Sequence, residues 1–391
     1  MTAPPPPNAP LTVATHTAIA EVDADQWNAL AGDYPFMRHE FLDALERSRC
    51  VGTGTAWEPL HLSARDHTGR LLGAMPLYLK HDSRGEFVFD WGWADAFERA
   101  GLAYYPKLVA AAPFTPANGP RILLAQDCND THVSRALLDA CHDVAEQVSA
   151  SSIHVLFPDD RARAALNAAG YMERKGCQFH WKNRGYSSFD EFLAEFTSAK
   201  RKKVKRERRR IAEAGIEFEH LPADALSSRD WDAVFEFYSR TFHRRGRAPY
   251  LNRAFFDEIT ATLPAQLIVI LARYASQPIA GAICFRSDSA LYGRYWGSLA
   301  DFHSLHFETC YYQGIDYCIA EGLTLFEPGT QGEHKVSRGF SPTPTWSCHN
   351  VFDAQFRQAI EAFLTRETAH VDAYIDEVDE HVPYKSARPE I

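Results

Sequence analysis

The sequence predicts a mixed α/β protein with two lobes built on one pattern of strands and helices. Its 391 residues exceed the size that one hydrophobic core usually serves, so two domains are expected. A short segment also occurs twice, as LSARDHTGRLLGA at 62–74 and as ILARYASQPIAGA at 270–282. Each copy has the pattern of a strand, a polar turn and a second strand opening on Gly-Ala. The repeat therefore predicts two lobes of the same α/β type, with mixed sheets.

The segments that follow the two copies also correspond. A strand carrying Trp-Gly is expected next, at Trp91 in the first lobe and at Trp296 in the second. Apolar residues at helical spacing then predict a helix that leads into an apolar strand. The predicted helices span 131–148 and 308–321, and the strands after them end at Pro158 and Pro328.

The limits of the two domains follow from turn residues and composition. Gly170 is suited to end the last helix of the first lobe, so the predicted domains are 12–170 and 171–375. Residues 1–11 contain four successive prolines, which favour an extended tail, and 376–391 are expected to form a C-terminal tail. The N-terminus lacks the basic and apolar regions of a signal peptide, so a cytoplasmic protein is expected.

Composition limits the class of protein. Hydrophobic residues make up 46% of the chain and charged residues 24%, and no apolar stretch approaches the roughly 18 residues of a membrane span. We therefore expect a soluble protein. A formal net charge of −10 argues against a protein devoted to nucleic-acid binding.

Cysteine and histidine spacing gives no support to a metal site. The eight cysteines contain no C-x-x-C pair, so reduced and mostly buried thiols are expected. His303, His306, His334 and His349 lack the H-x-x-x-H or H-x-H spacing of metal ligands. We predict that the protein binds no metal.

An intensely basic segment is predicted to form one long helix over 188–215. Ser188 is a suitable N-cap, Glu191 is its capping-box partner and Gly215 is the stop. Nine of the eleven residues from Lys200 to Arg210 are Lys or Arg, and like charges four apart destabilise a helix.

Two interpretations of this basic helix remain open. It is either a solvated face or a site for an anion, which includes coenzyme phosphates, a nucleotide-linked substrate, an acidic membrane surface and aminoacyl-tRNA. The residues predicted to bind donor phosphates are Lys200, Lys203 and Arg206.

His306 and Glu308 stand just before the helix expected to start near Thr309. In an extended segment, residues two apart point to the same side, so this pair would share a proton or activate an amine. The alternative is that both only cap the helix.

The run TQGEHKVSRGF brings both signs of charge into a glycine-rich loop. Glu333 and His334 are candidate bases, whereas Lys335 and Arg338 suit an anion or a tetrahedral oxyanion. A purely structural, salt-bridged loop is the alternative. Gln331 and Tyr311 complete the substrate-binding residues predicted near this loop.

A strand beside this loop carries Arg294 among aromatic residues. Strict alternation would place Arg294 on the same face as Tyr292 and Trp296, which either line the substrate groove or pack in the core.

The chain resembles the FemAB-like acyltransferases, also described as peptidoglycan biosynthesis and recognition proteins, from about Phe36 to about His370. The likeness rests on VFDWGWADAFERAGLAYYPKL, PFTPANGPRIL, KRKKVKRERRRI, PYLNRAFF, LYGRYWG, LHFETCYYQGIDYCI and EPGTQGEHKVSRGFSP. The resemblance implies a tandem GNAT-like fold and places the family's lysine-containing turn at Lys335 to Phe340. It also implies acyl transfer from a thioester or an aminoacyl-tRNA to an amine.

The resemblance leaves several activities open. The leading expectation is direct aminolysis of an activated donor such as acyl-CoA, without a covalent enzyme intermediate. Alternatives are long-chain N-acylation of a lipid amine such as a sphingoid base, aminoacyl-tRNA-dependent transfer to a cell-wall precursor, and a non-catalytic module that binds a head group. The chain departs from simpler GNAT enzymes because Arg294-Tyr-Trp-Gly297-Ser-Leu matches only the first half of their pyrophosphate loop.

The expected partners follow from these alternatives. A small-molecule or lipid amine is the predicted acceptor, with peripheral contact at the inner membrane as a further expectation and tRNA as a less favoured partner. No oligomeric state is predicted.

Overall fold

The computed structural model describes residues 10–299, 302–330 and 332–385. Most of the predicted N-terminal tail, 1–9, lies outside these ranges. The chain divides into two compact units, Met1–Gly176 with Thr345–Val371, and Cys177–Pro344 with Asp372–Ile391. This division differs from the continuous domains predicted at 12–170 and 171–375, because the chain returns to the first unit near its end.

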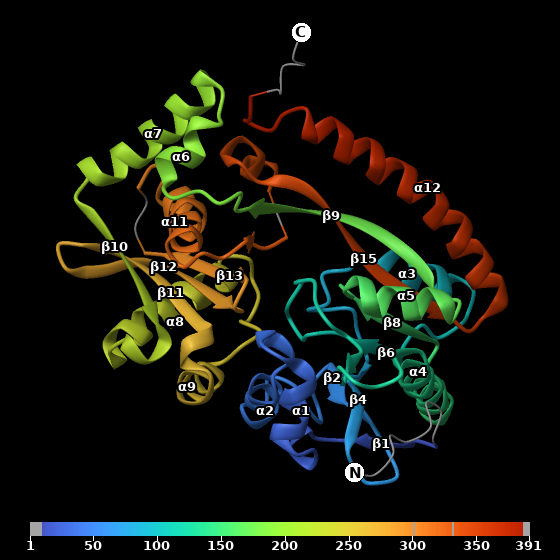
Figure 1. Cartoon of the computed structure of the whole chain (residues 1–391). Coiled ribbons are helices and arrows are strands. Elements are labelled where there is room, and N and C mark those ends of the chain that lie inside the picture. Colours follow the sequence, from blue (N-terminus) through green and yellow to red (C-terminus); the bar gives the residue numbers. More distant parts are fainter. Residues whose placement is uncertain (1–9, 300–301, 331, 386–391) are drawn as a thin grey trace. The chain divides into compact units, whose positions relative to one another are not determined.

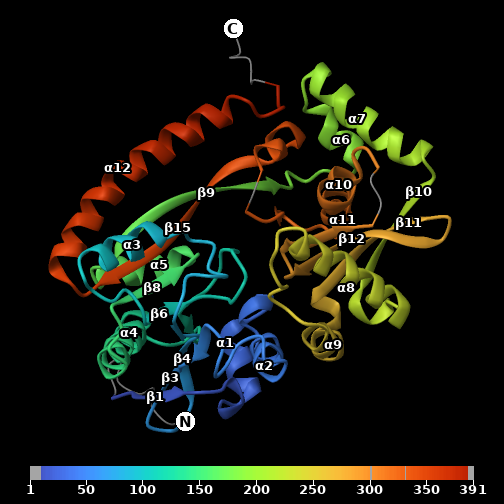
Figure 2. The same ribbon diagram turned by 180° about the vertical axis from the view of Figure 1, so that it is seen from behind.

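The first unit contains two groups of strands (Figures 1 and 2). One sheet has the order β1-β3-β4-β7, formed by Thr12–His16, His61–Arg65, Leu71–Met75 and Leu123–Leu124. The other strands are β8, β6, β5 and β2, formed by Ser152–Leu156, Lys107–Ala110, Tyr78–Lys80 and Trp57–Pro59, and they adjoin the end of β15 (Ser341–Val351). The helices are α1 (Ala24–Ala31), α2 (His39–Arg47), α3 (Trp91–Arg99), α4 (Asp130–Gln147), α5 (Asp160–Ala168) and the first part of α12 (Ala354–Asp379).

Helix α4 confirms the helix predicted at 131–148 and forms the centre of the first core. Its apolar stripe, including Val133, Leu137 and Cys141, is fully buried with side chains of β3, β4 and β8. The helix leads into β8, which pairs in parallel with β6. The predicted hairpin at 62–74 is present as antiparallel β3 and β4.

The strand expected at Trp91 is wrong, because this residue begins helix α3. Trp93 and Phe97 are one turn apart and both are buried against Tyr104 and the start of α12. A strand would place Trp91 and Trp93, two apart, on one face, whereas a helix separates them and keeps Trp93 and Phe97 together. Trp91 itself is 48% exposed.

The second unit contains the strands β10-β11-β12-β13-β14-β9 in that order. Their bounds are Ile216–Pro222, Leu267–Tyr274, Gln277–Arg286, Ala290–Ser298, Leu325–Glu327 and Met172–Lys182. The first four pair antiparallel, and β14 runs parallel to β13. The helices are α6 (Phe189–Ala194), α7 (Ser198–Glu213), α8 (Ser228–His243), α9 (Arg253–Thr262), α10 (Leu305–Phe307), the π-helical turn η5 (Glu308–Tyr312) and α11 (Gln313–Ala320).

Both units contain an antiparallel hairpin and a strand that a helix links to a parallel neighbour. In the first unit α4 joins β6 to β8, and in the second α10, η5 and α11 join β13 to β14. The two lobes of one mixed α/β type expected from the internal repeat are confirmed, as is the tandem GNAT-like fold that the resemblance implies. Within the described ranges, no helix has the length and apolarity needed to cross a membrane.

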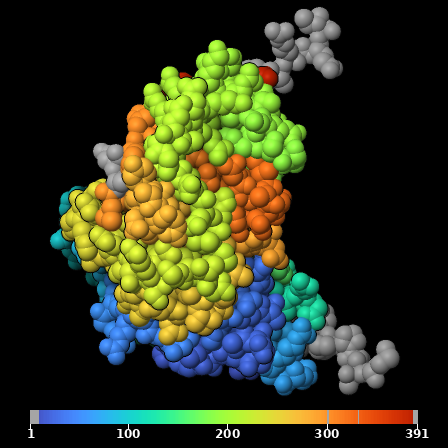
Figure 3. Space-filling view, turned by 90° about the vertical axis from the view of Figure 1, so that its left-hand side faces the viewer, coloured from blue at the N-terminus to red at the C-terminus, as the bar shows by residue number. Residues whose placement is uncertain are grey.

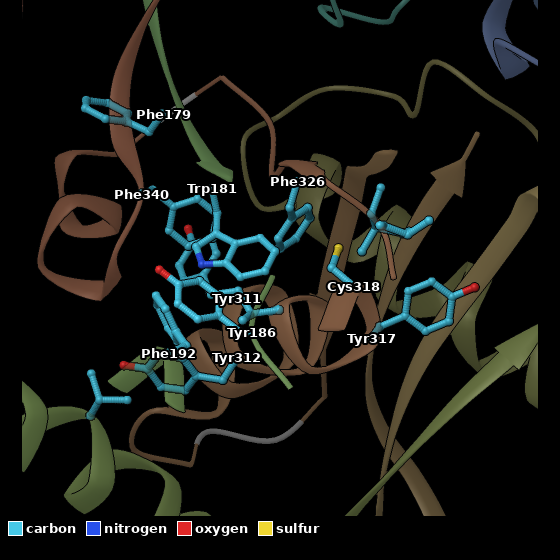
Figure 4. Packing of buried hydrophobic residues seen from close by; sticks show 14 of the residues in the cluster. Phe179, Trp181, Tyr186, Phe192, Tyr311, Tyr312, Tyr317, Cys318, Phe326 and Phe340 are labelled. Carbon is cyan, nitrogen blue, oxygen red and sulfur yellow. The ribbon is translucent and has the colours of Figure 1, made fainter. Parts of the chain in front are cut away.

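The core of the second unit is unusually aromatic. Figure 4 shows Trp181, Tyr311, Phe326 and Phe340 packed together, with ring centroids of Tyr311 and Phe340 5.4 Å apart. Phe326 of β14 contacts Phe340, which in turn contacts Tyr311 of the helical turn η5, so Phe340 links the end of β14 to η5. The segment after Glu327 therefore begins at a strand end that is held by core packing.

The basic segment forms two helices, so the prediction of one long helix over 188–215 is wrong. Thr197 N donates to Pro383 O at 2.8 Å, and Lys385 N donates to Glu195 O at 2.9 Å. These bonds interrupt the helix at Glu195–Thr197. They also show that the predicted C-terminal tail is ordered through residue 385, since Val378, Val382 and Tyr384 join the core.

The ends of the basic segment are largely as expected. Ser188 Oγ accepts a hydrogen bond from Glu191 N at 3.2 Å, and Gly215 ends α7 with a φ of 73°. The Glu191 carboxylate accepts from Ser187 N at 2.8 Å, and not from the cap residue as the capping box predicts.

Gly297 is required by the packing of α8 on β13. A Cβ atom added there would lie 1.9 Å from the carbonyl oxygen of Phe237, which is main chain of α8. We expect Gly297→Ala to lower the free energy of unfolding by about 3 kcal/mol, because the helix must move away from the sheet. Urea titration measures this loss. Gly92→Ala is the matched control, since a Cβ there meets no atom within 4 Å. Equal midpoints for the two variants would contradict this packing.

Candidate active site

The predicted loop after β14 forms a short 3-10 helix, η6, over Glu333–Arg338. Gly332 and Gly339 flank it with φ values of 107° and 96°, which side-chain-bearing residues rarely adopt. The turn directs Lys335 and Arg338 inward and leaves Glu333 and His334 exposed.

Lys335 has a buried ammonium group. Its residue is 1% exposed, and Nζ donates one hydrogen bond, to Gly329 O at 2.5 Å. Burial lowers the pKa of Lys335 from 10.5 to about 7, since no carboxylate lies close enough to offset the desolvation. Among the described residues Nζ has no second hydrogen-bond partner. The group therefore keeps donor capacity for an anion or a developing oxyanion.

His334 and His306 lie beside this lysine in an aromatic cluster. His334 Nε2 is 2.7 Å from the hydroxyl of Tyr311, and the rings of His306 and His334 have centroids 5.8 Å apart. Burial and the neighbouring cations lower the pKa of His334, and similar causes lower that of His306 to about 4. Both imidazoles are therefore neutral at pH 7, the form in which histidine accepts a proton.

Arg338 is committed to contacts within the protein. Its guanidinium donates to Glu207 Oε1 at 2.8 Å and to His334 O at 2.7 Å, and it lies 3.4 Å from the ring centroid of Phe307. Glu207 also accepts a hydrogen bond from the hydroxyl of Tyr312. Arg338 therefore ties η6 to helix α7.

The segment with His306 and Glu308 is helical, so the extended conformation expected for it is wrong. Residues two apart on a helix diverge, and each side chain has different neighbours. Glu308 accepts from Gln313 at 2.8 Å and pairs with Arg208 at 3.2 Å, while His306 packs against Trp296. Glu308 is thus an anchor for α7, and a proton shared between Glu308 and His306 has no support in this geometry.

A β-bulge in β13 changes the face on which Arg294 was expected. Gly293 pairs with Cys284 and Tyr295 with Ile283, which leaves Arg294 as the extra residue. The bulge reverses the alternation, so Tyr292 and Trp296 lie on opposite faces, contrary to the expectation. Trp296 remains at the site through its contact with His306, whereas the Arg294 guanidinium lies 5.5 Å from the ring centroid of Tyr295.

The remaining predicted residues are dispersed. Glu333 accepts a hydrogen bond from the Tyr374 hydroxyl at 2.9 Å, and Gln331 lies outside the described residues. Lys200 and Lys203 are half-buried on α7, while Arg206 is exposed. Partial burial and the charge of Arg338 lower the pKa of Lys203.

The thiols near the site are unsuited to nucleophilic attack. Burial raises the pKa of Cys284 to about 12 and raises those of Cys310 and Cys318 as well. These thiols therefore stay protonated at neutral pH. In the described part of the chain no group of three or more His, Cys, Asp or Glu side chains is placed to hold a metal ion.

The first unit contains a buried charged cluster that the sequence analysis did not identify. Lys107 Nζ donates to Asp90 Oδ2 at 2.5 Å, to Glu86 Oε2 at 2.8 Å and to Ser83 Oγ at 3.0 Å. Burial and the charge of Asp90 raise the pKa of Glu86 to about 7, although Lys107 opposes this shift. One oxygen of each carboxylate, Glu86 Oε1 and Asp90 Oδ1, has no hydrogen-bond partner.

Two buried histidines extend this cluster. His154 Nδ1 and His349 Nδ1 are 2.6 Å apart, and Ser152 and Ser347 bond the opposite nitrogens at 2.8 Å. Desolvation lowers the pKa of His154 to about 3, so the pair is neutral. The signal was the charged and aromatic run VFDWGWADAFERAGLAYYPKL, whose Asp90, Tyr104 and Lys107 meet only in the folded chain.

Comparisons with known proteins agree with this fold. The FemX structure superposes with a TM-score of 0.53 at 14% identity, covering 90% of this chain and all of FemX. The C-terminal domain of a putative lysylphosphatidylglycerol synthetase from Agrobacterium fabrum gives 0.54 at 11%, covering 89% of this chain and 97% of that domain. L-PGS from Bacillus licheniformis gives 0.50 at 11%, with 86% and 97% covered. At these identities the likeness establishes a shared fold.

No curated protein matches the sequence. A family model does match, over residues 18–386, and its description is peptidoglycan biosynthesis/recognition. The match includes both units and every described residue of the candidate site. The chain therefore belongs to the FemAB-like family.

Proposed function

We propose that the protein is an N-acyltransferase that moves an acyl group from an activated donor, such as acyl-CoA, to an amine by direct aminolysis in the second unit. Family membership and the shared fold support a transferase of acyl or aminoacyl groups. The observation that carries the proposal is the pairing of a neutral His334, bonded to Tyr311, with the buried ammonium of Lys335.

The proposed step needs one base and one oxyanion donor. The amine nitrogen attacks the donor carbonyl and loses a proton to neutral His334. The C–S bond of the thioester then breaks, and the departing sulfur takes this proton from His334 to leave as the thiol. Lys335 Nζ donates to the oxygen that becomes negative in the tetrahedral intermediate. The protonated thiols of Cys284, Cys310 and Cys318 favour direct transfer over a covalent enzyme intermediate.

The donor's phosphates are proposed to bind at the inner side of α7. Lys200 and Lys203 are half-buried there, and Lys203 lies within the electrostatic influence of Arg338. Arg206 is exposed and is not included in this role. Trp296, His306 and Tyr311 supply an aromatic wall for the acyl chain or the acceptor.

His334→Gln tests the assignment of the base. We expect amide formation from acyl-CoA and a pool of amines, including long-chain amines, to fall by about 10²–10⁴ in kcat, because glutamine cannot accept the proton. Mass spectrometry of the amide products measures the rate. The matched control is His370→Gln on the exposed part of α12, which should leave the rate unchanged. Equal rates for the wild type and His334→Gln would exclude this base.

A further inference from the structure

Helix α7 carries cations that the described chain does not neutralise. Of the nine Lys and Arg residues from Lys200 to Arg210, three form ion pairs: Lys205 with Asp190, Arg208 with Glu308 and Asp316, and Arg209 with Glu213. The other six pair with no carboxylate in the described ranges, namely Lys200, Arg201, Lys202, Lys203, Arg206 and Arg210. Such a density of like charge is unfavourable for a helix without an external anion.

The outward side of α7 presents several positive charges on a helix that is held in place by its inner side. Val204, Glu207 and Ile211 are buried on the inner side, one turn apart. Glu207 is bonded to Arg338 at 2.8 Å, and Arg208 reaches Asp316 at 2.5 Å, so the helix is held to the unit behind it. The exposed cations on the opposite side are Lys202, Lys205, Arg206 and Arg209, and the yellow-green residues of this segment are at the surface in Figure 3. The ion pairs of Lys205 with Asp190 and of Arg209 with Glu213 are formed between exposed side chains, so they are weak and leave both cations open to an external anion.

The shape of this side favours an extended anion over a small one. A hollow of about 460 Å³ runs along α7, and every residue that lines it belongs to the helix itself. No residue outside α7 lines this hollow, so a single phosphate in it would be held from one side only. A surface that presents many phosphates would contact all the exposed cations of α7 at the same time.

A second hollow beside α7 has apolar side chains. It has a volume of about 410 Å³ and is lined by the half-buried Phe189 and the buried Leu193 of α6, with Ser188, Asp190, Lys205 and Arg208 as its polar residues. Apolar groups next to cations match a lipid, whose acyl chain and phosphate are adjacent. The exposed side of α7 has no aromatic residue, and the Phe189 ring in the adjacent hollow is covered by the Arg208 guanidinium at 4.2 Å. RNA, whose bases stack on aromatic side chains, therefore fits this face less well.

We propose that the α6–α7 face, defined by Lys202, Lys205, Arg206 and Arg209 with the Phe189–Leu193 hollow, docks on a bilayer of anionic phospholipid. This interaction goes beyond the transfer reaction and does not depend on it. Binding is electrostatic, with phosphates on the four cations, and therefore weakens with salt.

Vesicle flotation with the full chain tests this proposal. The protein should bind vesicles of phosphatidylcholine mixed with phosphatidylglycerol and dissociate from them as the NaCl concentration is raised. It should not bind vesicles of pure phosphatidylcholine. The variant Lys202→Gln, Lys205→Gln, Arg206→Gln, Arg209→Gln should bind about two to three orders of magnitude more weakly, since each cation contributes about fivefold near an anionic surface.

The matched control removes the same number of charges from exposed arginines elsewhere in the second unit. It replaces Arg229 at the start of α8 and Arg244, Arg245 and Arg247 just after its end by Gln, and it should retain vesicle binding. An equal loss in both variants would show that only total charge matters and would overturn the proposal. Vesicle binding that does not depend on phosphatidylglycerol would also overturn the proposal, as would binding to tRNA without binding to vesicles. Thermal unfolding of each variant verifies that it is folded.

Discussion

Lys335→Met is expected to lower kcat for amide formation by about 10²–10³, the usual effect of removing one oxyanion donor. Methionine matches the length of the lysine stem and fills the same buried space, so the loss reports the ammonium group and not a cavity. Steady-state kinetics with a saturating donor measures it. An unchanged kcat would remove Lys335 from the reaction and leave His334 as the only tested group.

The same substitution is expected to stabilise the protein at neutral pH. The folded pKa of Lys335, about 7, is lower than its unfolded value of 10.5, so the unfolded chain binds more protons between these values. Stability therefore rises with pH through this window, and the cost of the buried charge is fully present below pH 7. We expect Lys335→Met to add about 1–2 kcal/mol at pH 7 and to reduce the slope above it.

Wild-type activity should depend on pH in a related way. Lys335 donates to the oxyanion only when protonated, so kcat should fall as pH rises through about 7. It should also fall in acid, where His334 becomes protonated, and the lowered pKa of His334 moves that limb below its ordinary position. Exposed Lys182→Met is the charge-matched control and should preserve both the rate and the profile.

Lys107→Met is expected to destabilise the protein by about 3–5 kcal/mol, the largest structural effect of any substitution considered. The lysine is fully buried and contacts Asp90 at 2.5 Å and Glu86 at 2.8 Å. Its removal leaves a buried carboxylate without its counterion, which costs more than the original pair contributed. Urea titration at pH 7 measures the change.

A second substitution separates charge from packing in this cluster. Lys107→Met with Asp90→Asn leaves no unpaired charge at position 90, so the double variant should recover part of the lost stability. A loss below about 1 kcal/mol in Lys107→Met would contradict a charged cluster. Failure of the double variant to recover any stability would assign the loss to packing.

The hairpin repeat and the helical periodicity at 131–148 were sufficient to predict two α/β lobes. Both signals are local, since alternation and a spacing of three to four residues depend only on neighbours in the chain. The same local rules gave the cap at Ser188 and the stop at Gly215. These local rules failed at Trp91, which begins a helix whose Trp93 and Phe97 are buried against α12.

The site shows the same division between local and distant causes. The sequence alone pointed to the EPGTQGEHKVSRGF run, with Glu333 and His334 as candidate bases and Lys335 and Arg338 as candidate anion-binding groups. Only the tertiary structure committed Arg338 to Glu207, paired Glu308 with Arg208 and buried the ammonium of Lys335. The reason is physical, because desolvation and ion pairing depend on groups brought together from distant parts of the chain. The buried Lys107, Glu86 and Asp90 cluster could not be predicted for the same reason.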